Sequence, residues 1–360
     1  MRFHKTGGIL VFIGAFTAMM VLSFKNADKP TPYELPELRF FPKMPVTDNP
    51  PTLEGAELGR FLFYDPILSA DKTFSCASCH RQEVAFSDAP NRFSKGIDGD
   101  LMKRNTMPLF NLAWYPALFW DGKAASIEEQ VFHPLRAHNE MNLDWSTAVQ
   151  RIRQSDFYLP KFQATFGNAE IDSILIAKAI AQFERTLISN NSKYDQVLRG
   201  EAYFTPAELE GFDLINDQTK GDCLHCHTTD ADALGTTTKF SNNGLEAAFK
   251  PDDYKDKGKA EVTGQTKDAG QFRIPSLRNV VVTAPYMHDG RFETLVQVLD
   301  FYSEGINNSY NIDSKMGMAH QGGVRLTENE KEKVIAFLKT LTDSTFLINP
   351  EFGNPFMTKN

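Results

Sequence analysis

The sequence predicts a mainly α-helical protein of two domains joined by long loops, and three observations support this fold class. First, the chain has 360 residues, which is about the length of two domains of ordinary size. Second, several segments carry apolar residues at the three- and four-residue spacing of a helix face, whereas the strict alternation of a half-buried strand is almost absent. Third, long segments with Gly and Pro separate these stripes, so the loops need something other than sheet pairing to order them.

The composition excludes several classes of protein. With 41% hydrophobic and 23% charged residues, the chain can form real hydrophobic cores and is neither disordered nor collagen-like. The 38 Lys and Arg residues are outnumbered by 46 Asp and Glu residues, which gives a formal net charge of -8. No basic run offsets this acidity, so the sequence argues against nucleic acid as a partner.

Residues 1–24 differ from the rest of the chain. A short stub with Arg2 and Lys5 precedes the almost wholly apolar run from Ile9 to Phe24. This pattern predicts a secretory signal peptide. Because the run is long and no clear Ala-x-Ala site follows it, an uncleaved N-terminal membrane anchor is the alternative. Either one places the remainder of the chain outside the cytoplasm, in the periplasm, and no later segment is apolar enough to span a membrane.

Two helices are predicted in the N-terminal half, after an irregular beginning. Residues 25–50 are rich in Pro and charge and are expected to form a lead-in without a core of its own. Residues 53–64 carry a rough helical stripe. Residues 171–189 carry a more regular one, with Ile176, Ile180, Phe183 and Leu187 on the same face.

Two capping signals predict helices in the C-terminal half. Thr205 is a favourable N-cap, and Pro206 suits the first helical position after it. Thr327 and Glu330 have the spacing of a capping box. The apolar stripe that follows them consists of Val334, Phe337, Leu338 and Leu341.

The four cysteines of the chain form two identical motifs. They lie at positions 76, 79, 223 and 226, and each pair ends in a His, so the motifs are Cys76-Ala-Ser-Cys79-His80 and Cys223-Leu-His-Cys226-His227. A single Cys-x-x-Cys could be a redox dithiol or half of a zinc site, and a zinc ion held by all four cysteines is the alternative. Two Cys-x-x-Cys-His motifs in an exported chain instead predict two covalently attached c-type haems, with His80 and His227 as the proximal iron ligands.

Two haems also define the predicted domains. The motifs are well separated along the chain, which fits one haem in each half, and each haem gives long loops a large apolar surface on which to pack. We therefore expect a mainly α fold with two cytochrome c-like haem domains, in residues 51–203 and 204–345, followed by a C-terminal tail in residues 346–360.

Longer blocks around these motifs resemble a known family. The chain from about Leu58 to Leu341 is similar to the bacterial di-haem cytochrome c peroxidases, and more closely to their MauG-like branch. The blocks that carry the resemblance are LGRFLFYDPILSADKTFSCASCH, RNTMPLFN, FWDGKAASIEEQ, the Glu140-Met141 pair, FRIPSLRNV and TAPYMHDGRFETL. Their common order and spacing make the match specific.

The resemblance identifies the first haem as the one that reacts with peroxide. Many members of the family block this haem with a distal His on the following loop, but here Asp98 stands at that position. We expect an open first haem, with His133 or His138 as the alternative ligand. The resemblance also aligns Glu140 with the family's catalytic glutamate, and a carboxylate suits the proton transfers of peroxide cleavage. It aligns Trp120 with the tryptophan between the haems, although an indole is more commonly a core residue.

The resemblance makes two further suggestions about metal ligands. At the second haem, Tyr302 stands where peroxidases usually have a distal Met, as it does in MauG-like proteins. A phenolate ligand favours Fe(III), whereas a thioether favours Fe(II), and Met287, Met316 or Met318 would be the ligand if Tyr302 only packs. The family also holds a calcium ion between its haems, and the aligned positions here are Asn105, Thr283 and Pro285.

Together these features predict a periplasmic di-haem oxidoreductase that reduces hydrogen peroxide with electrons from a small c-type cytochrome or cupredoxin. The first alternative is a MauG-like enzyme that oxidises side chains of a partner protein. The second is a di-haem electron carrier without catalysis.

Overall fold

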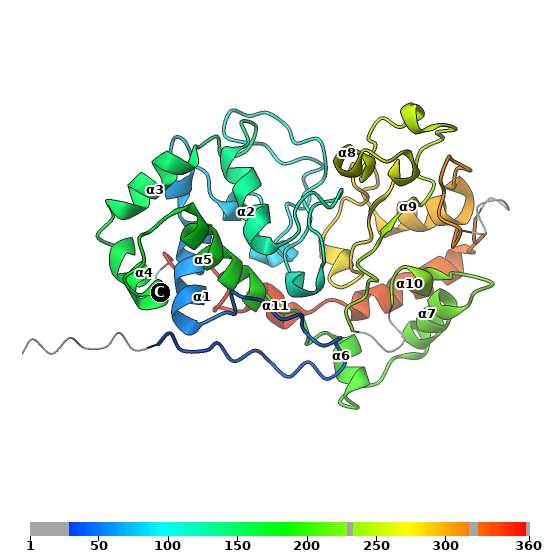
Figure 1. The fold of residues 1–360 in the computed structure, drawn as a ribbon. Helices are drawn as coiled ribbons and strands as arrows, with labels where there is room; N and C mark the ends of the chain where they lie inside the picture. Colours follow the sequence, from blue (N-terminus) through cyan, green and yellow to red (C-terminus); the bar gives the residue numbers. More distant parts are fainter. Residues whose placement is uncertain (1–28, 229–232, 317–322, 358–360) are drawn as a thin grey trace, which may run out of the picture.

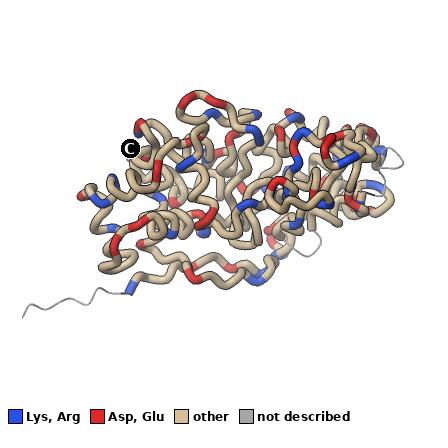
Figure 2. Tube along the Cα trace, turned by 45° about the horizontal axis from the view of Figure 1, so that its top comes forward, with Lys and Arg blue, Asp and Glu red and all other residues tan. Residues whose placement is uncertain are grey.

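The computed structural model describes residues 29–228, 233–316 and 323–357, and it forms two helical lobes that lie side by side (Figure 1). The predicted segment 1–24 lies outside these residues. Within them, no helix is both long and apolar enough to cross a membrane. Acidic and basic residues are interspersed over both lobes (Figure 2).

Helix α5 (Ser173–Thr186) forms the centre of the first lobe. The side chain of Asp172 caps it by accepting a hydrogen bond from the backbone N–H of Leu175, and the predicted apolar stripe is buried. The stripe predicted over residues 53–64 is helix α1, and both predicted helices are therefore confirmed. The helices that pack around α5 are α1 (Leu53–Tyr64), α2 (Ile127–Arg136) and α3 (Trp145–Arg153), and α4 (Tyr158–Phe166) packs against α1 and α3.

Helices α7 (Pro206–Asn216) and α10 (Glu328–Thr340) pack together in the second lobe. Both predicted N-caps are confirmed as capping boxes. The two helices approach closely at Gly211, where a Cβ atom would lie only 2.0 Å from the carbonyl oxygen of Lys333. The remaining elements between α5 and α10 are α6 (Lys193–Leu198), β1 (Phe240–Ser241), α8 (Ala260–Thr263), β2 (Phe272–Arg273) and α9 (Leu295–Asp300).

Strands are almost absent from the described residues, as predicted. Strands β1 and β2 form a single antiparallel pair of two residues each, in which Phe240 faces Arg273. Long loops therefore make up much of both lobes (Figure 1).

Both ends of the described chain connect the lobes. The lead-in runs beneath them in irregular conformation (Figure 1). Its Leu35, Leu38 and Phe41 pack in a cluster that includes Trp114 of the first lobe and Leu234 of the second. The C-terminal residues return to the first lobe through α11 (Ser344–Ile348). Phe346 of this helix is buried against Phe86 and Phe110, with ring centroids 5.7 and 6.1 Å apart, and Phe352 belongs to the same cluster.

A buried ion pair anchors the start of the second lobe. Arg278 donates two hydrogen bonds to the carboxylate of Asp195 in α6, at 2.8 and 2.5 Å, and neither side chain is more than 4% exposed. Asp195 also accepts the backbone N–H of Ser192 at the start of the same helix. One carboxylate thus joins two segments that are far apart in sequence.

We predict that Asp195→Ala destabilises the protein by about 3–5 kcal/mol, because it leaves the Arg278 charge buried and unpaired. Denaturant unfolding followed by circular dichroism would measure this change. The matched control is Lys257→Ala, which removes an exposed ion pair with Asp252 and should cost less than about 1 kcal/mol. Equal losses in the two variants would contradict the assignment.

Candidate functional site

The two Cys-x-x-Cys-His motifs fold into the same tight turn. Each lies in a short 3-10 helix, at Cys76–Ser78 and Cys223–His225. In each turn the backbone N–H of the His donates to the carbonyl of the first Cys, at 3.0 Å in the first motif and 2.8 Å in the second. The turn folds both cysteines and the following His into one compact segment, as attachment of a haem requires.

The four thiols form neither a disulfide nor a zinc site. All are free, and burial raises the pKa of each. The two pairs belong to separate hydrophobic clusters, one with Cys76 in the first lobe and one with Cys223 in the second. Within residues 29–228, 233–316 and 323–357, no three His, Cys, Asp or Glu side chains converge as metal ligands. A zinc ion held by all four cysteines is therefore wrong for this fold.

The two motif histidines are both partly buried and have different hydrogen bonds. Nδ1 of His80 donates to the carbonyl of Phe86 at 2.7 Å, which leaves Nε2 as the free ligand atom. Nδ1 of His227 is buried without a hydrogen bond of good geometry, although the backbone of Pro275 and Gly235 lies close enough to favour its protonated form. Burial lowers the pKa of His227 to about 4. Both rings are therefore neutral at neutral pH, as an iron ligand requires.

Glu140 lies beside the first motif. The carboxylate is close enough to Cys76 and Cys79 that its charge raises the pKa of both thiols. Burial raises the pKa of Glu140 itself, and the nearby Lys123 opposes this shift. Its backbone carbonyl accepts the N–H of Ile97 at 2.9 Å, so the loop after the first motif holds the glutamate in place.

Gly96 allows this loop to pack so closely. A Cβ atom at position 96 would lie 1.9 Å from the carbonyl oxygen of Asn139, directly before the glutamate. The neighbouring Asp98 points to the surface, with its carboxylate 3.8 Å from Nδ1 of the exposed His138. His133 instead lies edge-on to Phe119 at 5.3 Å.

Trp120 is held between the two lobes by its backbone and its indole. Its Nε1 donates to the carbonyl of Asn105 at 2.8 Å, and its own carbonyl accepts the N–H of Arg273 in β2 at 2.9 Å. The N–H of Asn105 in turn donates to the carbonyl of His288 at 2.7 Å. The His288 ring stacks on Phe272 at 3.7 Å. These contacts join three segments around the tryptophan.

Arg104 reinforces this junction. It donates to Asp256 of the second lobe at 2.7 and 2.8 Å and to Asp121 of the first at 2.5 Å.

Burial lowers the pKa of His288 to about 4, although Asp256 opposes the shift. The stacked imidazole is therefore neutral at neutral pH.

Tyr302 lies near the second motif. It belongs to the π-helical turn Phe301–Gly305, a distortion that is common at functional sites. Burial raises the pKa of its phenol to about 12, and the charges of Cys226 and Cys223 add to that shift. The hydroxyl accepts a hydrogen bond from Nδ2 of Asn243 at 3.1 Å, and the same Nδ2 lies 3.7 Å from the sulfur of Met287.

Two of the three methionines that are alternative ligands of the second haem lie close to Tyr302. Met287 and Met316 pack in the same cluster as Tyr302, whereas Met318 lies outside the described residues. The structure therefore brings the phenol and two thioethers together near the second motif, with the Asn243 amide between Tyr302 and Met287.

The residues aligned with a calcium site have oxygen atoms that suit this ion. Nδ2 of Asn105 donates to the carbonyl of Arg92 at 3.0 Å, so its Oδ1 faces away from this bond. Arg92 and Pro285 both lie next to Gly290, so the segments that carry Asn105's partner and Pro285 are neighbours. The hydroxyl of Thr283 donates to the carbonyl of Val280 at 3.2 Å. Carbonyl and amide oxygens of this kind are calcium ligands.

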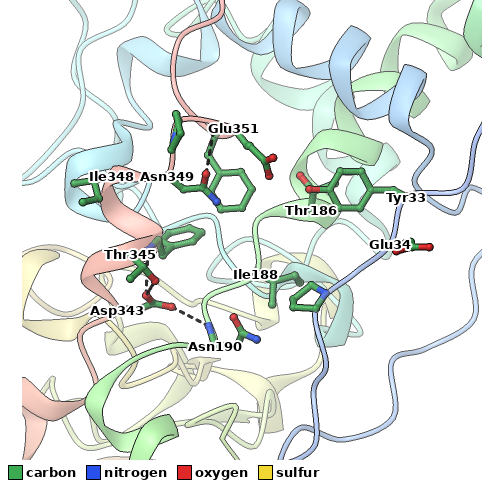
Figure 3. Close-up of a pocket in the computed structure, with 14 residues that line it drawn as sticks. Tyr33, Glu34, Thr186, Ile188, Asn190, Asp343, Thr345, Ile348, Asn349 and Glu351 are labelled. Atoms are coloured by element: carbon green, nitrogen blue, oxygen red, sulfur yellow. Dashed lines mark hydrogen bonds between the residues drawn. The ribbon is translucent and has the colours of Figure 1, made fainter.

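A cavity of about 580 Å³ lies between the lead-in and the C-terminal residues (Figure 3). It is lined by the lead-in at Tyr33 and Glu34, by Thr186 at the end of α5, and by Asp343 and Thr345 at the start of α11. None of the site residues predicted from the sequence lines this cavity.

Comparison with known proteins identifies the family. The model of the di-haem cytochrome c peroxidase family matches residues 53–203. The chain is 33% identical over 296 residues to the methylamine utilization protein MauG of Methylophilus methylotrophus, which covers 81% of this chain and 84% of that protein. The chain belongs to the di-haem cytochrome c peroxidase family. It is also 33% identical to the cytochrome c551 peroxidase of Nitrosomonas europaea, over 86% of this chain and 85% of that one.

Solved structures show the same fold. A crystal structure of a MauG-like protein associated with microbial copper homeostasis superimposes with a TM-score of 0.81 at 34% identity, and covers 90% of this chain and 100% of that one. The di-haem peroxidase BthA of Burkholderia thailandensis superimposes with a TM-score of 0.72 at 22% identity. The resemblance stated from the sequence is confirmed, and the chain is a di-haem, peroxidase-type oxidoreductase. The relatives include both peroxidases and MauG, so they do not choose between these roles.

The structure adds a buried acid that sequence reasoning missed. Glu184 lies in α5 at 4% exposure, and its Oε2 has no hydrogen-bond partner. Its charge raises the pKa of the Cys76 thiol. Burial raises the pKa of Glu184 to about 8, against the opposing charge of Arg185. No motif marks this residue, because its burial depends on how α5 packs.

We predict that Glu184→Gln makes the folded protein more stable than the wild type, and that this difference in stability grows as the pH rises. The carboxyl ionises near pH 4.5 in the unfolded chain and near pH 8 in the fold, so the folded state loses stability between these values. A neutral amide removes that loss, which is on the order of 3 kcal/mol at pH 7 and absent at pH 4. Denaturant unfolding at pH 4, 7 and 8.5 measures it. The exposed Glu170→Gln is the control, and a gain that is the same at every pH would refute the assignment.

Proposed function

We propose that this protein is an exported, periplasmic enzyme that reduces hydrogen peroxide with electrons from a small redox protein, either a c-type cytochrome or a cupredoxin. Its N-terminal segment would direct the export. One observation carries the catalytic proposal: Glu140 is partly buried beside Cys76 and Cys79, and a neighbouring loop fixes its backbone.

The two motifs would hold the haems. Cys76 and Cys79 would attach the first haem, Cys223 and Cys226 the second, and Nε2 of His80 and of His227 would face the irons. When bound, haem iron supplies the electron transfer needed to reduce the O–O bond. The polypeptide would supply the binding site, the proton transfers and the path between the two haems.

Glu140 would move the proton. Its carboxylate would accept the proton from the inner oxygen of hydrogen peroxide and return it to the outer oxygen, which then leaves as water. Burial favours the protonated state of this carboxyl, while Lys123 favours the ionised state. A carboxyl that can exchange between these two states is the kind of group that general acid–base catalysis uses.

Trp120 would relay electrons. It lies at the junction of the lobes, where its indole donates to the carbonyl of Asn105 and its backbone carbonyl accepts the N–H of Arg273. We also propose one calcium ion at Asn105, Thr283 and Pro285. The ion would stiffen the segment that holds the indole, because Asn105 belongs to both sites.

Glu140→Gln should retain both haems and slow the reaction with peroxide by roughly 10²–10⁴-fold, because an amide cannot take up and return the proton. Stopped-flow mixing of the reduced protein with peroxide measures the rate. The exposed Glu170→Gln should react normally. A near-normal rate in Glu140→Gln would remove this residue from the mechanism, and a wild-type protein that does not consume peroxide would instead support the electron carrier.

A MauG-like oxidation of a partner protein is the second candidate. It is favoured by Tyr302, whose buried hydroxyl lies near the thiols of the second motif and accepts the Asn243 amide. As a phenolate ligand, Tyr302 would favour Fe(III) at the second haem, and that haem would then be a poor donor of stored electrons.

One spectral experiment separates the two candidates. The fully oxidised protein is mixed with one equivalent of peroxide, alongside Tyr302→Phe and the control Met287→Leu. If the MauG-like candidate is right, the wild type and Met287→Leu react without prior reduction, and Tyr302→Phe changes the resting spectrum and loses this reaction. If the wild type reacts only after reduction and Met287→Leu alone alters the second haem, Tyr302 is not a ligand and the peroxidase is favoured.

A further inference from the structure

Arg273 is a buried cation without a carboxylate. Its side chain lies in β2 at 4% exposure, and both Nε and Nη1 are buried without an acceptor. Nη2 contacts the sulfur of Met107 at 2.9 Å, which is a weak acceptor, and the guanidinium lies over the ring of Tyr115 at 4.1 Å. Burial lowers the pKa of Arg273, but a guanidinium stays charged at any ordinary pH.

Two other buried arginines have the carboxylate partner that Arg273 lacks. Arg278 has the carboxylate of Asp195, and Arg185 has that of Glu128 at 2.6 and 2.8 Å. Both are two-pronged pairs, which offset the cost of removing a charge from water. Without such a partner this cost is several kcal/mol. The geometry therefore points to an anion that meets Arg273 in the complete protein and that these side chains do not supply.

The position of Arg273 limits the source of that anion. Its N–H bonds the carbonyl of Trp120, while Pro275, two residues later, lies near Nδ1 of His227. Its side chain contacts Met107 and Tyr115 of the first lobe. The backbone of Arg273 thus lies between Trp120 and the segment that contacts the second motif, and its guanidinium reaches the first lobe at the boundary between the lobes. A haem held at that motif brings carboxylates of its own, the propionates on one edge of the porphyrin.

We propose that Arg273 binds a propionate carboxylate of the second haem and so turns that edge of the haem toward Trp120. The proposal requires a haem at the second motif but no peroxide chemistry. A buried positive charge stabilises Fe(II) over Fe(III), because reduction adds one negative charge nearby. Arg273 therefore raises the reduction potential of the second haem and keeps the bound propionate ionised.

Redox titration of the fully loaded protein, followed by absorbance, tests this role without turnover. In Arg273→Met the potential of the second haem shifts to a more negative value, with a smaller change at the first. It also gains a pH dependence between about pH 5 and 7, because the freed carboxylate can now take up a proton on reduction. Arg273→Lys shifts in the same direction by less, since it keeps the charge but not the two-pronged bond.

The matched control is Arg151→Met, which removes an equal charge from an arginine bound to the carbonyls of Ile67, Ser69 and Ala70. It should change neither potential. Haem content and circular dichroism establish that each variant is loaded and folded. If Arg273→Met does not load two haems, the potential of the second haem and its pH dependence are measured in Arg273→Lys instead.

Two results would overturn the proposal. One is an unchanged second-haem potential, with no new pH dependence, in a loaded Arg273 variant. The other is a wild-type potential that varies with chloride or phosphate at constant ionic strength, since the anion would then be diffusible. If the loaded protein instead shows the predicted shift but has no peroxide activity, the site stands and the proposed function fails.

Discussion

The hydrogen bonds around Trp120 are the constraint on which the arrangement of the site depends. Asn105 holds the indole from the first lobe, Arg273 holds its carbonyl from the second, and His288 closes the circuit through the N–H of Asn105. None of these bonds is strong alone. Because they share one small region between the lobes, they fix where one half of the molecule lies relative to the other.

This junction places the chemistry of each half within reach of the other. The motif turn and Glu140 belong to the first lobe, and the second motif with Tyr302 belongs to the second. The lead-in and the C-terminal residues reinforce the arrangement. The lead-in packs against residues of both lobes, and the C-terminal residues return from the second lobe to pack in the first. A di-haem enzyme needs such a rigid frame, since electron transfer depends on a fixed separation between its centres.

The buried polar groups fall into two kinds. Arg278 and Asp195 pair their charges inside the polypeptide. Arg273, Nδ1 of His227 and Oε2 of Glu184 have no partner of good geometry. Because burying a polar group without a partner is costly, such atoms mark places where the chain is shaped for something besides itself. Glu184 exerts its charge on Cys76, His227 belongs to the second motif, and Arg273 is two residues from Pro275, whose backbone lies near His227.

The sequence by itself determined the helical fold class, the haem attachment motifs and the family, because capping boxes, apolar spacing and the Cys-x-x-Cys-His motif are local patterns. It marked Thr205 and Thr327 as caps because a cap involves residues only three positions apart. Only the tertiary structure decided that Glu140 lies beside the first motif, that Asn243 reaches Tyr302, and that Glu184 and Arg273 are buried without partners. Burial and pairing depend on contacts between segments up to about half the chain apart, and no local pattern carries that information.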